Sequence, residues 1–272
     1  MKTSLKSLRS VLFTVLGLVI LTVSCTKDEN ALSEMPKTDD SNFQLVTPNQ
    51  DDYPKIDFLV DWYGFSKDDI EVTESALLAE GDIAFSRLNF WEFYRPEKDT
   101  VSQSKRHYKW SNLVWAVTNV RIYIHSSINS AWKAAIVSAY KEYNNLNGRI
   151  YFTEVTSRTF RGINVSMSTL SNSNNIAVTY YPSIFGLPGN ITINTYYSNS
   201  LTAAAKKKVM MHELGHSIGI RHTDGGEGTL INGVSDASKP DPASVMIGNL
   251  NMSYTGFSTA DKQAFLILYP GQ

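Results

Sequence analysis

Short apolar stretches and longer helical ones alternate along the chain from about residue 112 onward. Residues 120–124 alternate apolar and polar side chains, as a half-buried strand does. Residues 130–146 place aromatic and aliphatic side chains on one broad face at helical spacing, and Gly148 lies just beyond them. Four further strand candidates follow, separated by turns rich in Asn, Ser and Gly, at residues 150–155, 163–167, 176–181 and 191–195. The pattern predicts a compact mixed α/β unit.

Two more helices are expected in the C-terminal part. Thr202 is a suitable N-cap for a helix that runs through an alanine- and lysine-rich stretch into residues 209–211. Ser258 and Asp261 form a pattern similar to a capping box in front of a last helix, which Pro270 ends.

The beginning of the chain carries the pattern of an export signal. Residues 1–10 contain three basic residues and no acid, and residues 11–23 are almost continuously apolar. Thirteen helical residues span about 20 Å, less than the roughly 30 Å of a bilayer core. A basic start, a short apolar run and small residues therefore predict a secretory signal and not a membrane span.

The residues that end this signal, Leu21 to Cys25, resemble a bacterial lipobox, although the leucine lies one position further from the cysteine than usual. Residues 27–29 resemble the acidic export tag on surface lipoproteins of some Gram-negative bacteria. The resemblance implies a lipoprotein signal peptide over residues 1–25, acylation of Cys25, and an outer-membrane or cell-surface location. The alternative is an ordinary secretory signal with a stray free cysteine.

The stretch between the signal and the α/β unit divides in two. Residues 26–52 are polar and poor in large apolar side chains, which predicts a flexible tether. Residues 53–106 regain aromatic and aliphatic side chains, but too few for an independent domain. The last part, residues 107–272, is expected to hold the chemistry.

Composition and charge exclude several classes of protein. Lys plus Arg number 25 and Asp plus Glu 26, so a basic nucleic-acid-binding domain is excluded. A single cysteine excludes a disulfide framework and a cysteine-rich zinc module. Paired acids at residues 39–40, 51–52 and 68–69 lack the ligand spacing of a calcium loop, so we expect solvated turns there and find no support for calcium.

The strongest chemical signal lies in the helix that follows Thr202. His212 and His216 are four residues apart, so their imidazoles lie on one helical face and can bind a single ion. Glu213 flanks that ion without having to ligate it. Imidazole nitrogen suits zinc, and zinc acidifies a bound water that a neighbouring carboxylate can deprotonate. His222 can join only if the helix ends first, which Gly219 allows because glycine accepts positive φ.

The residues from His212 to His222 resemble the zinc motif of the metzincin clan of endopeptidases. Within the clan they resemble the dual-action HEIGH metallopeptidase family, with leucine in place of its isoleucine. The resemblance implies one catalytic zinc bound by His212, His216 and His222. It implies that Glu213 is the general base in the hydrolysis of peptide bonds by zinc-activated water.

The resemblance covers about 160 residues, from residue 112 on. It implies an α+β (mixed α/β), metzincin-like catalytic domain with a five-stranded twisted mixed sheet, two major helices, a C-terminal helix and a methionine turn. Met246 is the candidate for that turn. Two residues later, where some metzincins have a tyrosine, the chain has Gly248. By the same analogy a peptide substrate lies along residues 175–181 as an edge strand.

An exported peptidase must be kept inactive, and residues 53–106 are the available pro-segment. Cys25 is the only thiol and is consumed in processing, which excludes a cysteine switch. Residues 80–83 resemble a Gly-Asp stretch in the pro-segments of astacin-like and HEIGH-like enzymes, where an aspartate can occupy the zinc site. We expect Asp82 to do so here, and the alternative is a plain turn between two strands.

Together these features predict a secreted, lipid-anchored zinc metalloendopeptidase that is made as a zymogen and acts on proteins or peptides as a monomer. One alternative is a surface adhesin or binding lipoprotein with a structural zinc site, against which Glu213 argues. Another is a hydrolase of non-peptide amides on the same scaffold.

Overall fold

A computed structural model describes residues 43–94, 108–109, 112–170, 175–224, 229–234, 241–249 and 256–271. The export signal, Cys25 and its lipobox lie outside these residues. Among the residues described, no helix combines the length and the apolar character needed to cross a bilayer.

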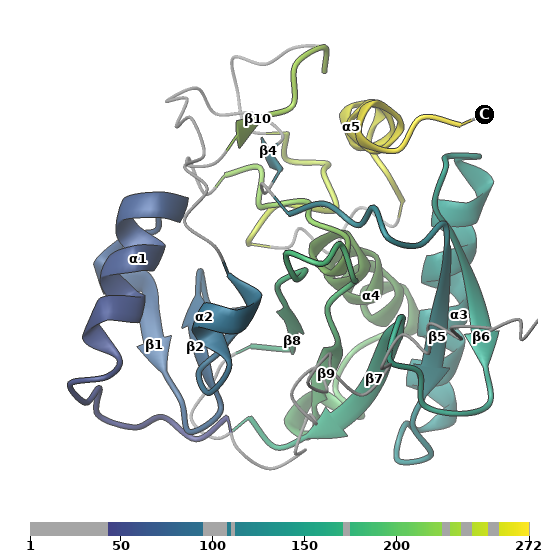
Figure 1. The fold of residues 1–272 in the computed structure, drawn as a ribbon. Coiled ribbons are helices and arrows are strands. Elements are labelled where there is room, and N and C mark those ends of the chain that lie inside the picture. Colours follow the sequence, from purple (N-terminus) through teal and green to yellow (C-terminus); the bar gives the residue numbers. More distant parts are fainter. Residues whose placement is uncertain are drawn as a thin grey trace, which may run out of the picture. The chain divides into compact units, whose positions relative to one another are not determined.

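Eight strands form one mixed sheet in the order β1-β2-β3-β8-β9-β7-β5-β6 (Figure 1). Their bounds are β1 Ile70–Val72, β2 Ala76–Ala79, β3 Ile83–Ser86, β5 Asn119–Ile124, β6 Tyr151–Val155, β7 Ile163–Ser168, β8 Ala177–Tyr180 and β9 Ile191–Asn194. Two short strands, β4 (Tyr108–Lys109) and β10 (Thr229–Leu230), pair with each other. The helices are α1 Tyr53–Tyr63, α2 Phe90–Phe93, α3 Ser130–Asn145, α4 Ala203–Ser217 and α5 Thr259–Leu268, with 3-10 turns η1 Lys67–Asp69 and η2 Thr195–Tyr197.

The expected fold class is confirmed, and the five strands predicted between residues 120 and 195 are all present. They lie side by side, with β8 antiparallel to β9 and the other neighbours parallel. The prediction of a five-stranded sheet is nevertheless wrong. The segment of residues 53–106 adds β1, β2 and β3, because β3 pairs in parallel with β8 through Ile83–Thr179 and Ala84–Tyr180. The edge expected for a substrate is therefore occupied by the chain's own strand.

Helices α3 and α4 pack against each other and against the sheet. The side chain of Asn129 begins α3 by accepting a hydrogen bond from the Trp132 backbone N–H. Trp132 is fully buried in the largest apolar cluster, together with Ile122, Val165 and Leu214. Because this cluster joins both helices to the central strands, it fixes where α4 lies relative to β8.

The N-terminal segment, residues 53–106, has an aromatic core of its own that includes Tyr181, the residue that follows β8. Phe85 of β3 contacts the rings of Tyr63 and Phe90, and it also contacts Tyr181 just beyond β8, with centroids 5.1 Å apart. Along β8 every second side chain faces one side of the sheet. Thr179 therefore lies on the same face as Tyr181, at the boundary between this aromatic core and α4.

Residues 43–52 differ from the flexible tether predicted for them. Phe43 is 4% exposed and packs against Tyr180, with ring centroids 5.9 Å apart. Asp52, predicted to lie in a solvated turn, is fully buried and accepts hydrogen bonds from Arg87 at 2.7 and 2.8 Å. Burial raises the pKa of Asp52, but these bonds to Arg87 outweigh that effect and hold the pKa below its usual value. The expectation failed because the partner of Asp52 lies 35 positions away.

Candidate active site

Helix α4 carries the first part of the site and ends where the sequence predicts. The Thr202 hydroxyl caps the helix by accepting a hydrogen bond from the Ala205 N–H at 3.2 Å. The last helical residue is Ser217, and Gly219 then has a φ of 102°. A Cβ at Gly219 would lie 2.9 Å from the Asn112 carbonyl oxygen, so both the backbone angle and the space require glycine.

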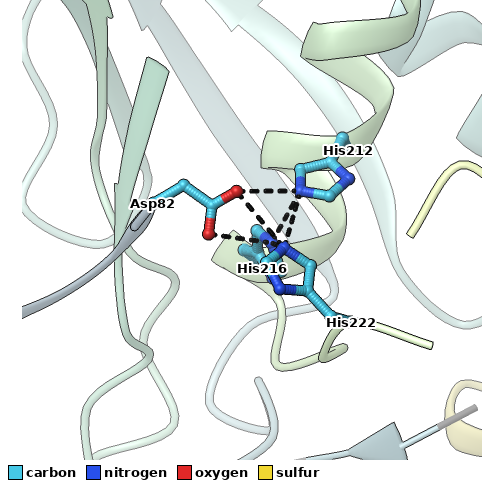
Figure 2. A group of neighbouring side chains, drawn as sticks. All are labelled: Asp82, His212, His216 and His222. Carbon is cyan, nitrogen blue, oxygen red and sulfur yellow. Dashed lines mark hydrogen bonds and ion pairs between the residues drawn. The ribbon is translucent and has the colours of Figure 1, made fainter. Parts of the chain in front are cut away.

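The chain reversal at Gly219 brings three imidazole rings together (Figure 2). The Nε2 atoms of His212 and His216 are 2.9 Å apart, and each lies 3.1 Å from Nε2 of His222. All three side chains are at most 4% exposed. The structure therefore gathers the three histidines that the sequence singles out.

The other nitrogen of each ring has its own acceptor. Nδ1 of His212 donates to the Val245 carbonyl at 2.7 Å, and Nδ1 of His216 donates to the Ile220 carbonyl at 2.8 Å. Nδ1 of His222 lies 3.0 Å from a carboxylate oxygen of Glu80. With the Nδ1 atoms so engaged, the Nε2 lone pairs face one another, which is the tautomer that a metal-binding histidine needs.

These distances fit a zinc ion. Four ligands at about 2.0–2.1 Å in a tetrahedron lie about 3.3 Å from one another, close to the observed separations. Lone pairs this close repel each other unless a cation or a proton lies among them. The residues present therefore fit a zinc ion, which His212, His216 and His222 would hold.

Asp82 lies on the fourth side of this group (Figure 2). One carboxylate oxygen is 3.2 Å from Nε2 of His212 and 3.2 Å from Nε2 of His222, and the other is 3.9 Å from Nε2 of His216. The backbone of Asp82 is fixed as well, because its carbonyl accepts a hydrogen bond from the Thr179 N–H at 2.8 Å. The stretch is a turn between β2 and β3, and the carboxylate of Asp82 lies beside the histidine rings.

Burial and neighbouring charges together set the pKa values of these groups. Burial, followed by the neighbouring His212, lowers the pKa of His216. Burial also acts to lower the pKa of His222, but the carboxylates of Asp82 and Glu80 outweigh it and raise that pKa. Burial raises the pKa of Asp82, but the charge of His222 and the hydrogen bonds of the rings hold it well below its usual value. The carboxylates thus favour positive charge at the centre of the group.

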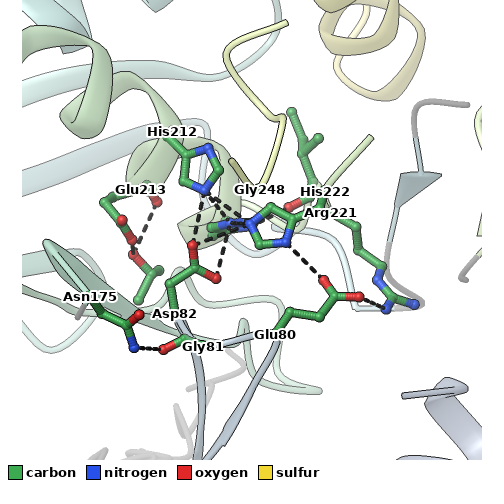
Figure 3. A network of polar contacts seen from close by, with 12 residues as sticks. Glu80, Gly81, Asp82, Asn175, His212, Glu213, Arg221, His222 and Gly248 are labelled. Carbon is green, nitrogen blue, oxygen red and sulfur yellow. Dashed lines mark hydrogen bonds and ion pairs between the residues drawn. The ribbon is translucent and has the colours of Figure 1, made fainter. Parts of the chain in front are cut away.

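Glu213 points from α4 toward the sheet and away from the solvent (Figure 3). It is 2% exposed, and its Oε2 accepts a hydrogen bond from the Thr179 hydroxyl at 2.5 Å. Burial and the negative charge of Asp82 raise the pKa of Glu213 well above its ordinary value, and the Thr179 bond opposes this only in part. A carboxyl group with a raised pKa takes up a proton more readily than an ordinary carboxylate does.

The candidate methionine turn lies directly against α4. Met246 is 1% exposed, and a Cβ at Gly215 would lie 2.3 Å from its sulfur, so the turn and the helix are in close contact. The carbonyl of Val245 is the acceptor for His212. Asp261, from the capping box of α5, accepts hydrogen bonds from the Ser244 hydroxyl at 2.6 Å and from the Val245 N–H at 2.9 Å. The capping box of α5 therefore supports the ring orientation of His212.

Gly248 lies beside His222 (Figure 3). A Cβ at this position would be 3.2 Å from Nδ1 of His222, and the Gly248 N–H donates to Asp224 at 2.7 Å. A side chain here would press on the ring. Some metzincins have a tyrosine at the position of Gly248. The next tyrosine in this sequence, Tyr254, lies outside the described residues.

Residues 79–235 match a protein family described as the dual-action HEIGH metallo-peptidases. The chain belongs to this family. It is a zinc metallopeptidase, as the histidine spacing predicts. The matched range of the HEIGH family includes Glu80, Asp82 and the three histidines but ends before Met246.

Solved structures of myroilysin are similar to the chain, and 131 chains match in all. One covers 60% of this chain and 83% of its own, with 16% identity and a TM-score of 0.42. A second covers 59% and 87%, with 14% identity and a TM-score of 0.41. No curated protein matches the sequence.

Three residues of the site were not found by sequence reasoning: Glu80, Thr179 and Arg221. Thr179 lies within a predicted strand, and a polar residue on the buried face of a strand is a signal that could have identified it. Arg221 directly precedes His222 and could have been suspected from that position. Glu80 is two residues before Asp82, yet its partner Arg221 is 141 positions away.

We expect Asp261→Asn to lower the free energy of unfolding by about 2 kcal/mol, because an amide cannot accept all the hydrogen bonds that this buried carboxylate accepts. We also expect zinc affinity to fall about tenfold, since the turn that holds His212 loosens. Chemical denaturation and competition with a chromogenic chelator measure these effects. Asp57→Asn is the control, because Asp57 is 59% exposed. An unchanged zinc affinity in Asp261→Asn would show that the turn does not depend on this carboxylate.

Proposed function

We propose that this peptidase cleaves internal peptide bonds of protein substrates, with zinc held by His212, His216 and His222 and with Glu213 as the general base. The observation that supports this most directly is the convergence of the three Nε2 atoms within 3.1 Å of one another. Membership in a peptidase family favours hydrolysis over the alternative of a binding lipoprotein with a structural zinc site.

Glu213 is buried, and a hydrogen bond from Thr179 holds its carboxyl group, as the role of a general base requires. Zinc in this site supplies Lewis-acid chemistry, which polarises a carbonyl group and acidifies water. Glu213 takes the proton from the attacking water and delivers it to the nitrogen of the leaving amine. Thr179 holds one carboxylate oxygen of Glu213 at 2.5 Å and so limits the rotation of the carboxyl group during both transfers.

The edge of β8 is proposed to bind the substrate backbone. Strand edges bind extended peptides through main-chain hydrogen bonds, and Thr179 of β8 is also the partner of Glu213. A peptide on β8 would therefore lie close to the general base. In this structure β3 makes those hydrogen bonds, with Thr179 donating to Asp82 and Tyr181 donating to Ala84.

Residues 53–106 are proposed to act as a pro-segment, with Asp82 as the latency ligand. A catalytic zinc site keeps a position open for water, whereas a site closed by four protein ligands does not. Asp82 offers that fourth ligand, because its carboxylate oxygens and the three Nε2 atoms provide ligand atoms within 4.8 Å of one another. The segment thus blocks both the metal and the strand edge.

The location of the protein is also part of the proposal. The basic start, the short apolar run and the lipobox-like residues around Cys25 support export and anchoring by a lipid at the outer membrane or cell surface. An exported peptidase with its site closed by its own segment could cross the cell without damaging it.

Glu213→Gln tests the proposed mechanism. We expect one zinc per chain to remain, because Glu213 is not among the ligands, and peptide cleavage by activated protein to fall about 10²- to 10⁴-fold for loss of the base. Metal analysis and a fluorogenic peptide assay measure the two effects. Glu142→Gln is the matched control, because the side chain of Glu142 is 37% exposed and forms an ion pair with Lys207. Full turnover by Glu213→Gln would exclude the assigned role.

Asp82→Ala tests the proposed latency. We expect zinc affinity of the uncleaved full-length chain to fall about tenfold, measured by competition with a chromogenic chelator, because one protein ligand is lost and a position opens for water. Peptide cleavage should stay low, since β3 still occupies the edge of β8. Asp69→Ala is the control, because it removes an acidic residue that lines the cavity beside His222. If Asp82→Ala binds zinc as tightly as Asp69→Ala and the unchanged chain, Asp82 is not the latency ligand.

A further inference from the structure

Arg221 belongs to the catalytic part, residues 107–272, and lies close to Glu80 of the N-terminal segment, residues 53–106 (Figure 3). This segment covers the side chain of Arg221. Arg221 is 1% exposed although it directly precedes His222. One guanidinium nitrogen lies 3.1 Å from a carboxylate oxygen of Glu80, and another donates to the Tyr63 carbonyl at 3.1 Å. The guanidinium also lies over the ring of Phe65, 4.6 Å from its centroid. All three of these partners lie in residues 53–106.

Glu80 makes its contacts from a strained backbone. Its φ is 52° and that of Gly81 is 90°, so two of the three residues between β2 and β3 are left-handed. Glycine adopts a left-handed conformation readily, whereas glutamate is disfavoured there. The carboxylate of Glu80 offsets this strain by bridging Arg221 and Nδ1 of His222. Strain held at a functional site points to a use for the side chain.

Departure of the segment would change the charge beside His222. The cavity there is lined by the carboxylates of Asp68, Asp69, Glu71 and Glu80, all from the segment, and by Asp224 from the catalytic part. Four of these five carboxylates leave with the segment, whereas Arg221 stays. A guanidinium that loses its ion pair and its aromatic cover at the edge of a cleft is a ready site for another carboxylate.

We propose that Arg221 forms a carboxylate-binding subsite of the activated peptidase, which Glu80 occupies in the latent chain, and that a Glu or Asp side chain of the substrate takes its place. The inference rests on the proposed function, because it requires that residues 53–106 leave the cleft. It makes Arg221 a specificity-determining residue and predicts a preference for acidic peptides.

The test uses full-length, zinc-loaded protein with a specific protease site in place of residues 102–106. The protein is cut, the released segment is removed by gel filtration, and peptide pairs that differ only in Glu or Gln at one position near the scissile bond are compared. We expect kcat/KM to be at least about tenfold higher for the Glu peptide at one position. The ratio should fall to about one in Arg221→Gln and to an intermediate value in Arg221→Lys, which keeps the charge but not the planar fork.

The other outcomes of this test also support or overturn the Arg221 subsite. Cleavage without any Glu–Gln difference overturns the subsite and leaves the proposed function intact, even if Arg221→Gln fails to fold. A segment that stays bound while peptides are cleaved also contradicts it, because Arg221 would remain covered. If no peptide is cleaved, the proposed function fails, and fluorescence anisotropy decides on the subsite: tighter binding of the labelled Glu peptide supports it, and equal binding overturns it.

Discussion

The convergence of three imidazoles on one point is the constraint on which the rest of the site depends. Helix α4 can present only His212 and His216 on one face, so His222 must arrive on a chain that has left the helix. The positive φ of Gly219 makes that reversal without strain. Each ring is then oriented through its Nδ1 atom, and the acceptors come from the methionine turn, the residues after the helix, and Glu80.

The N-terminal segment belongs to the same sheet as the site that it covers. β3 pairs with β8 in parallel, and the aromatic core of the segment includes Tyr181 from the catalytic part. The hairpin of β2 and β3 places Glu80 and Asp82 at its tip, where both carboxylates reach the histidines. Removal of the segment would therefore expose the strand edge, the fourth ligand position and Arg221 in a single step.

Local features of the fold could be predicted from the sequence because local residues determine them. The Thr202 cap, the helix end before Gly219 and the capping box of Ser258 and Asp261 all depend on residues a few positions apart. The spacing of His212 and His216 follows from helix geometry, and Gly219 allows His222 to join them after the helix ends. The zinc family and its fold were predicted from the resemblance of residues 212–222 to the motif of that family.

Long-range partners could not be predicted in the same way. The pairing of β3 with β8 joins residues 96 positions apart, and many strands with similar alternation could have formed that edge. Burial of Phe43 and the Asp52–Arg87 pair likewise depend on surfaces that exist only after folding. Asp82 was predicted because residues 80–83 resemble a stretch of known pro-segments. The contact between Glu80 and Arg221 could not be predicted from the periodicity or spacing of residues.

The most direct test of this account is the metal content and coordination of the purified full-length chain, measured by diffraction at the zinc absorption edge. We predict one zinc per chain, bound by Nε2 of His212, His216 and His222 and by an oxygen of Asp82. A chain that holds no zinc, or rings that turn away from one another around it, would contradict the account.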